Sequence, residues 1–269
     1  MAGQENILEV KNLSIHFGGL KAVDNLSFSI KKNEIFGLIG PNGAGKTTVF
    51  NCITQFYVPN SGEVLFKTNK GTVENLVGKK VHNIIKLGLA RTFQNVEYIG
   101  DLSLIDNVKI GASSKFTSNF FGSIFVSPKS KRQEAAAEAE AEEYLTHLGI
   151  EAYKDMRADS VPYGVLKKME LARALMSKPT LLILDEPAAG LNEQETEELA
   201  NTIRMIRDRF DCTILLVEHD MPLVMGICDR ICAINFGQFL VCGDPETIRN
   251  DKSVQEAYLG VNDDGGKDE

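Results

Sequence analysis

Residues 40–48 read GPNGAGKTT, and this segment constrains the fold of the chain most strongly. It fits the P-loop pattern G-x-x-x-x-G-K-[ST], in which a glycine-rich turn surrounds a phosphate group. Glycines let the backbone curl tightly around the anion, because a Cβ would obstruct the approach. The fixed positions of the pattern are occupied by Gly40, Gly45, Lys46 and Thr47.

The flanking sequence supports a phosphate site. Residues 34–39 (EIFGLI) predict a buried strand, and residues 46–53 predict a helix directly after the turn. This order directs backbone N–H groups and a helix N-terminus at a phosphate. The alternative is a glycine-rich turn that matches the pattern by chance.

The loop residues have distinct expected roles. Lys46 is the expected positive charge for the β- and γ-phosphates of a nucleotide, and the Thr47 hydroxyl is an expected ligand for Mg²⁺. The remaining predicted nucleotide-binding residues of the loop are Gly40, Pro41, Asn42, Gly43, Ala44, Gly45 and Thr48.

A second chemical signal follows the apolar run at residues 181–184, where Asp185 and Glu186 are adjacent. In a parallel α/β sheet, the carboxyl ends of strands face the ligand crevice. Asp185 is therefore predicted to hold Mg²⁺, and Glu186 to polarise the attacking water as a general base. The alternative is an exposed strand end with two solvated acids, although adjacent carboxylates after a buried strand are unfavourable without a nearby cation.

His219 and Gln94 are further candidates for the same site. His219 follows the apolar run at residues 213–217, so its imidazole is predicted to reach the γ-phosphate edge near Glu186. Its alternative role is that of a packed structural histidine. Gln94 carries a neutral amide that can ligate Mg²⁺ or position water without changing the charge of the site. Its alternative is an ordinary surface glutamine.

Composition limits the partners and the compartment. The chain has 269 residues and a formal net charge of −8, which argues against nucleic acid as a main partner. The five cysteines lack metal-like or redox spacing, so we expect them to be small buried residues of the core. Their odd number also suits a reducing cytoplasm. We see no signal peptide and no apolar run near the ~20 residues that cross a bilayer. We therefore expect a chain that is soluble alone and reaches a membrane only through a partner.

Apolar patterns divide the chain into regions of different character. The first region predicts strands with antiparallel signals, at residues 7–17, 26–30 and 62–66. The middle predicts helices at residues 102–112, 129–148 and 166–176. Uninterrupted apolar runs then predict parallel strands buried on both faces, at residues 181–184 and 213–217. An amphipathic helix is expected between them at 193–209, followed by a hairpin near 237–238 and two short helices.

The motifs occur in one order: P-loop, Gln94, a helix start at residues 161–165, the Asp185–Glu186 pair and His219. In this order the chain resembles the ATP-binding-cassette (ABC) ATPases that drive membrane transporters, over residues 8–260. Within that family it is similar to the ATP-binding subunits of branched-chain amino acid importers. That similarity is carried by residues 15–24 (IHFGGLKAVD), 90–95 (ARTFQN), 185–192 (DEPAAGLN) and 257–260 (AYLG).

The resemblance implies an α/β fold, the P-loop NTPase ABC cassette. Such a cassette has a mainly parallel core sheet, an N-terminal antiparallel β subdomain and a helical subdomain. We assign residues 7–93 and 178–260 to the core with its antiparallel strands, residues 94–177 to the helical subdomain, and residues 261–269 to a flexible tail.

The resemblance also implies that two cassettes sandwich two ATP molecules head to tail, so that each P-loop faces the signature segment of the opposite subunit. Here that segment is residues 161–165 (VPYGV), with Tyr163 and Gly164 as its nucleotide contacts. The family signature reads LSGGQ. Because Pro162 supplies neither hydroxyl nor N–H, we expect the contact to rely on backbone donors and the helix end. Phe17 stands where the family stacks an aromatic ring on adenine, with a core or edge phenylalanine as the alternative.

These signals together predict an ATPase with Glu186, His219 and Lys46 as catalytic residues. The predicted metal ligands are Thr47, Gln94 and Asp185, and the expected cofactors are ATP and Mg²⁺. The implied function is to power a membrane transporter, foremost for branched-chain amino acid uptake. The alternatives are another ABC transporter (urea, another amino acid, or lipopolysaccharide export) and a soluble ABC ATPase that binds nucleic acid or ribosomes.

The implied partners are a second ABC ATPase subunit, in a homodimer or heterodimer, and transmembrane permease subunits. A substrate-binding protein would act indirectly, and no nucleic acid is expected. These partners would hold the chain at the cytoplasmic face of the cell membrane.

Two segments have competing interpretations. Residues 115–128 form an aromatic-rich stretch without acids, for which packing inside the helical subdomain competes with docking of the membrane subunit. Asn192 replaces an aspartate often found in the family. With Glu195 it also fits a helix N-cap that has a glutamate at N3.

Overall fold

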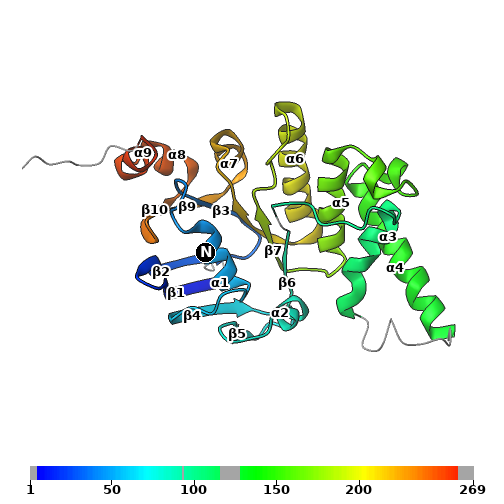
Figure 1. Ribbon diagram of the computed structural model, residues 1–269, viewed down its shortest axis with the longest axis horizontal. Coiled ribbons are helices and arrows are strands. Elements are labelled where there is room, and N and C mark those ends of the chain that lie inside the picture. The colour runs from blue at the N-terminus through cyan, green and yellow to red at the C-terminus, as the bar shows by residue number, and fades with distance from the viewer. Residues whose placement is uncertain (1–4, 93, 116–127, 260–269) are drawn as a thin grey trace, which may run out of the picture.

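The computed structural model describes residues 5–92, 94–115 and 128–259. The antiparallel strands lie at one side of the molecule and the helices α3–α5 at the other, with the larger sheet between them (Figure 1). The predicted tail at 261–269 and residues 116–127 of the aromatic stretch lie outside the described ranges. The subdomain boundaries assigned above stay a prediction.

The smaller sheet is antiparallel, as predicted, and has the strand order β2-β1-β4-β5. Its strands are β1 (Asn6–Phe17), β2 (Leu20–Lys31), β4 (Ser61–Lys67) and β5 (Val73–Asn75). β2 begins earlier than predicted, because pairing with β1 holds polar residues such as Lys21, opposite His16, in the ladder. The short, exposed β5 has no apolar alternation and was not predicted.

The larger sheet has the order β10-β9-β3-β8-β7-β6, and only the edge strand β10 pairs antiparallel. Its strands are β3 (Ile35–Ile39), β6 (Leu89–Arg91), β7 (Leu181–Asp185), β8 (Thr213–Val217), β9 (Arg230–Asn235) and β10 (Gln238–Gly243). In β7, Leu182 and Leu184 pack into one hydrophobic cluster and Leu181 and Ile183 into the other. The predicted burial of both sheet faces is therefore confirmed.

The helices are α1 (Lys46–Ile53), α2 (Val81–Leu87), α3 (Leu104–Lys109), α4 (Pro128–His147), α5 (Tyr163–Leu175), α6 (Glu193–Phe210), α7 (Met221–Ile227), α8 (Pro245–Asn250) and α9 (Lys252–Leu259). Short 3₁₀ turns occupy Ile110–Lys115, Glu151–Tyr153 and Ala158–Ser160. The unpredicted α7 is too short to show a helical period, although Asp220 caps it and a proline lies in its first turn. Within the described ranges, no helix combines the length and apolarity that a membrane span requires.

The capping prediction for Asn192 is confirmed at the start of α6. The Asn192 side chain accepts a hydrogen bond from the Glu195 backbone N–H at 3.0 Å, and the Glu195 carboxylate accepts one from the Asn192 N–H at 2.9 Å. This reciprocal pair satisfies two N–H groups that a helix start leaves without intrahelical partners.

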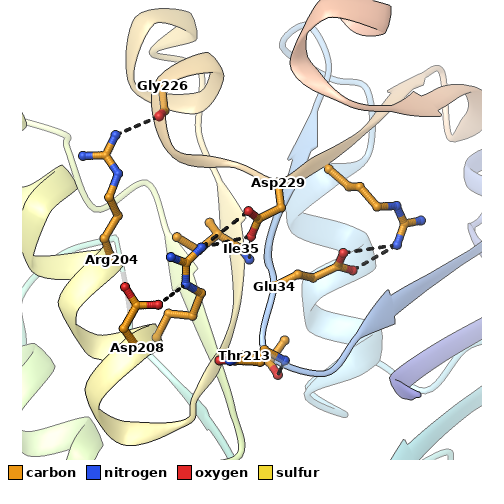
Figure 2. Close-up of polar contacts among 10 residues, drawn as sticks. Glu34, Ile35, Arg204, Asp208, Thr213, Gly226 and Asp229 are labelled. Atoms are coloured by element: carbon orange, nitrogen blue, oxygen red, sulfur yellow. Dashed lines mark hydrogen bonds and ion pairs between the residues drawn. The ribbon is translucent and has the colours of Figure 1, made fainter. Parts of the chain in front are cut away.

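A polar network fixes the amino ends of the central strands (Figure 2). Asp229 accepts hydrogen bonds from the Ile35 backbone N–H at 2.8 Å and from Arg207 Nη1 at 3.2 Å. On the other side of β3, Glu34 Oε1 accepts from Arg230 Nη1 at 3.0 Å. Helix α6 and strands β3 and β9 are thereby tied together at the end opposite the P-loop.

We expect Phe66→Ala to destabilise the chain by about 3 to 5 kcal/mol, because its fully buried ring packs between the two sheets. The matched control is Phe239→Ala, whose ring is 46% exposed, with an expected loss of about 1 kcal/mol or less. Urea unfolding measures both variants. Equal losses would contradict the assignment of Phe66 to the core.

Candidate active site

The P-loop lies between β3 and α1, where two positions admit only glycine. A Cβ built on Gly40 would lie 2.2 Å from the Ile234 carbonyl oxygen. Gly45 has φ +99°, and its Cβ would lie 2.6 Å from the Ala22 carbonyl oxygen. Backbone from β2 and β9 therefore closes around the loop, and the cradle keeps its shape because side chains are absent at these points.

Lys46 is held inside this loop. Its side chain is buried, and Nζ donates to the carbonyl oxygens of Gly40 at 2.6 Å and Pro41 at 3.1 Å. Burial lowers the pKa of Lys46, and the nearby charge of Glu186 opposes that shift. The ammonium thus occupies a preformed position in the cradle.

A cleft opens over the loop and collects residues from four parts of the chain. Asn42, Gly43, Ala44, Gly45, Lys46, Thr47 and Thr48 form its floor, with Phe17, Leu20, Lys21, Ala22, Glu186 and Phe236 around them. The Phe17 ring is 45% exposed and contacts Tyr57 edge-on, at 5.3 Å between ring centroids. Phe17 therefore has an open aromatic surface at the cleft, unlike a core phenylalanine.

Phe236 and Lys21 were not predicted from the sequence. Phe236 lies in the turn between β9 and β10, where the next residue, Gly237, donates its N–H to the Ala44 carbonyl oxygen at 2.9 Å. This contact joins segments far apart in the chain, so no local pattern could have indicated it.

Asp185 ends β7 and forms a buried ion pair with Arg91. Arg91 Nη2 lies 2.6 Å from Asp185 Oδ2, with side-chain exposures of 9% and 8%. Arg91 Nη1 also donates to Asn51 Oδ1 at 2.8 Å, which ties the pair to α1. The sequence predicts a metal ion as the cation near Asp185, whereas the structure also places the unpredicted Arg91 there. The available signal was a basic residue ending β6, the neighbour of β7 in the sheet.

The structure brings Glu186, Gln94 and His219 together. Gln94 Nε2 donates to Glu186 Oε2 at 2.7 Å, and His219 Nδ1 lies 3.9 Å from Glu186 Oε1. Glu186 has φ +47°, a left-handed backbone conformation that non-glycine residues rarely adopt. Strain of this kind is concentrated at functional sites, where the surrounding structure enforces it.

Glu218 is a further residue of the site that the sequence does not predict. Its side chain is 1% exposed, and it accepts backbone hydrogen bonds from Ala188 at 2.7 Å and from His219 at 3.0 Å. Burial raises the pKa of Glu218, and these N–H donors partly offset the shift. The carboxyl group fastens the turn after Glu186 to the turn that carries His219. Its position directly after β8 mirrors that of Glu186 after β7, which was the available signal.

Tyr163 and Gly164 lie apart from the P-loop cleft of the same chain. They begin α5 beside the turn after Glu186, where a Cβ built on Gly190 would lie 3.2 Å from the Tyr163 ring. Gly164 lines a separate depression together with Glu195 and Leu191. A role for these two residues at a nucleotide would therefore require the cleft of another subunit.

The chain matches the sequence profile of the ABC transporter family over residues 23–189. The profile of the branched-chain amino acid ATP-binding cassette transporter matches residues 240–264. The chain therefore belongs to the ABC transporter family and is one of its ATPase cassettes.

Among curated relatives, it is similar to the high-affinity branched-chain amino acid transport ATP-binding protein LivG of Escherichia coli (strain K12). The identity is 41% over 254 residues, covering 94% of this chain and 98% of LivG. The corresponding protein BraF of Pseudomonas aeruginosa is 40% identical over the same length and shares of each chain.

Solved structures agree with the fold. The ADP conformation of MJ1267, an ATP-binding cassette of an ABC transporter, has a TM-score of 0.81 at 27% identity, covering 95% of this chain and 99% of that one. A nucleotide-free ATP-binding cassette from an ABC transporter has a TM-score of 0.80 at 28% identity, covering 94% and 98%. The predicted α/β cassette is therefore confirmed.

We expect Arg91→Met to destabilise the chain by about 3 to 5 kcal/mol, because Asp185 would stay buried without its cation. If Asp185 also accepts a divalent cation, Mg²⁺ with ADP will stabilise this variant more than it stabilises the unaltered chain. Thermal unfolding with and without Mg²⁺–ADP measures the difference.

Arg230→Met is the matched control, since it removes the cation of another buried carboxylate, Glu34, at the opposite end of the sheet. Its gain from Mg²⁺–ADP should equal that of the unaltered chain. Equal gains in all three proteins would contradict a metal role for Asp185.

Proposed function

We propose that this chain is the ATP-hydrolysing subunit of a membrane importer for branched-chain amino acids. The observation that carries the hydrolytic part is that Lys46 and Glu186 line the same cleft, above a cradle that only glycines permit. One side chain can neutralise a terminal phosphate, and the other can activate water beside it.

In this proposal, the ATP phosphates lie in the P-loop and replace the carbonyl contacts of the Lys46 ammonium. The backbone N–H groups of residues 42–48 and the N-terminus of α1 then face the anion. Phe17 offers its open ring to the adenine at the cleft edge. The required donors come from a turn that neighbouring backbone encloses at Gly40 and Gly45, so ATP binding needs little ordering of the chain.

Thr47 lines the cleft, Asp185 precedes the cleft residue Glu186 in the chain, and Gln94 donates a hydrogen bond to Glu186, so these three residues lie where a Mg²⁺ ligand set is needed. Thr47, Asp185 and Gln94 would supply the oxygen ligands that this hard cation prefers. When bound, Mg²⁺ would neutralise charge that develops on the phosphates. Arg91 orients the Asp185 carboxylate through their buried ion pair.

Glu186 acts as the general base toward the attacking water. The hydrogen bond from Gln94 orients its carboxylate, and His219 lies on the other side of the same group. Glu218 connects the turn after Glu186 to the turn that carries His219, because its carboxylate accepts hydrogen bonds from backbone N–H groups of both turns. Catalysis is then mainly positioning and charge stabilisation, as phosphoryl transfer requires.

The separation of Tyr163 and Gly164 from their own P-loop cleft supports a paired assembly. A second ABC ATPase subunit would supply these residues to the ATP bound here, so that ATP favours the closed pair. Permease subunits would convert opening and closing into transport and would keep the chain at the cytoplasmic face of the membrane. The cargo rests on the similarity to LivG and BraF and on residues 240–264.

Glu186→Gln is expected to bind ATP as the unaltered chain does while hydrolysing it at least about a hundredfold more slowly, because the amide cannot accept the proton of water. Steady-state ATPase assays and ATP titration measure the two effects. Size-exclusion chromatography with ATP should show accumulated dimer. Glu197→Gln, an exposed glutamate on α6, is the matched control. Hydrolysis by Glu186→Gln at the unaltered rate would exclude its role as the base.

Transport of the proposed cargo is tested by uptake of labelled leucine into cells that lack this gene. Cells complemented with the unaltered gene should regain uptake, and cells complemented with Lys46→Ala should not, because Lys46 is the cation of the phosphate cradle. Active ATPase combined with unchanged leucine uptake in the deleted strain would refute the cargo and leave the enzyme assignment intact.

A further inference from the structure

Cys232 and Cys242 face each other across the β9–β10 hairpin. They are directly opposed in the antiparallel register, and directly opposed side chains share a face of the sheet. Both contact the same hydrophobic cluster. Opposed residues in such a ladder have Cα atoms about 4.5 to 5.5 Å apart, inside the range of about 4.4 to 6.8 Å that disulfides span. The sequence alone does not indicate this pairing, because the hairpin turn lies between the two cysteines.

The two sulfur atoms differ in access. Cys232 is fully buried in β9, next to β3, whereas Cys242 is half-buried in β10, the edge strand of the sheet. A small reagent from solvent therefore meets Cys242 first. Cys232 has no exposed surface through which the reagent could reach it directly.

The charged groups around the pair favour a thiolate on Cys242. Arg230 Nη2 donates to Cys242 Sγ at 3.5 Å, while Arg230 Nη1 contacts Glu34 at 3.0 Å. A hydrogen bond from the Cys232 thiol and the charge of Arg230 lower the pKa of Cys242, against the opposing effects of burial and of Glu34. The same hydrogen bond and burial raise the pKa of Cys232.

The other cysteines lack this environment. Burial alone raises the pKa of Cys52 to about 12, and burial is also the main cause of the raised pKa values of Cys212 and Cys228. These three side chains are buried thiols that serve as internal controls.

We propose that Cys242 and Cys232 form an oxidation site that reacts with hydroperoxides, with Cys242 as the nucleophile and Cys232 as the resolving thiol. The Cys242 thiolate attacks one peroxide oxygen and the O–O bond breaks. The departing oxygen takes up a proton and leaves as water or an alcohol, so that Cys242 becomes a sulfenic acid.

Cys232 completes the reaction. Its sulfur attacks the Cys242 sulfur, the S–O bond breaks, and the hydroxide leaves with the thiol proton as water. The two thiols have then supplied the two electrons that reduced the peroxide, and a Cys232–Cys242 disulfide remains. The site lies on the hairpin whose turn contacts the P-loop at Ala44 and carries Phe236 to the cleft.

The first test uses the reduced full-length chain and hydrogen peroxide. Peptide mapping should find the Cys232–Cys242 disulfide, reversible by dithiothreitol, while Cys52, Cys212 and Cys228 stay reduced. Cys232→Ser should stop at a sulfenic acid on Cys242, which dimedone traps. Cys228→Ser is the matched control and should form the disulfide as the unaltered chain does. Circular dichroism and thermal unfolding verify that each serine variant is folded.

Two results would overturn the proposal. One is a folded chain in which Cys242 stays reduced, or in which a buried control cysteine oxidises first.

The other comes from alkylation by iodoacetamide across a pH series. The alkylation rate of Cys242 should reach half its maximum below pH 9.0, the ordinary pKa of a thiol. At neutral pH, Cys242 should be alkylated at least about tenfold faster than Cys228. A pH midpoint near 9.0 for Cys242, together with equal alkylation rates at Cys242 and Cys228, would show that Cys242 is not the nucleophile that the reaction needs.

Discussion

The parallel pairing of β3, β8 and β7 is the constraint on which the rest of this structure depends. Parallel strands end at the same edge of their sheet, so the P-loop after β3, the Glu218–His219 turn after β8 and the Asp185–Glu186 pair of β7 converge there. The pairing is enforced by burial of both sheet faces in separate hydrophobic clusters. A shift of one residue in any of these strands would exchange its two faces and separate the chemical groups.

Each buried charge near the site has its own compensation, and this keeps the arrangement rigid. Lys46 is solvated by loop carbonyl groups, Asp185 by Arg91, and Glu218 by backbone N–H groups. Buried charges without such partners would cost several kcal/mol each in effective desolvation. The compensations also differ in kind. A phosphate can displace carbonyl groups from an ammonium, whereas the N–H groups around Glu218 belong to the fold itself.

Contiguous residues encode the parts of the site that could be predicted from the sequence. The P-loop, the acidic pair and the burial of β7 and β8 each combine a local pattern with a local physical reason, and the structure places them together. His219 could be proposed because it follows a predicted strand, and Gln94 because a neutral amide can ligate Mg²⁺ or position water, although their roles stay predictions.

Arg91, Glu218, Phe236 and the Cys232–Cys242 pair could not be predicted in the same way. Their partners lie on other strands, and sheet order is a tertiary property that hydrophobic periodicity does not encode. β6 is only three residues long, so its pairing beside β7, which delivers Arg91 to Asp185, has no periodic signal of its own.

We propose that the glycine cradle of the P-loop and the acidic pair Asp185–Glu186 act on one triphosphate. This proposal is tested most directly by a crystal structure of the full chain with Mg²⁺ and a non-hydrolysable ATP analogue. The account predicts the phosphates in the cleft floored by residues 42–48, with the terminal phosphate between Lys46 and Glu186. A nucleotide bound elsewhere on the chain, with this cleft empty, would contradict it.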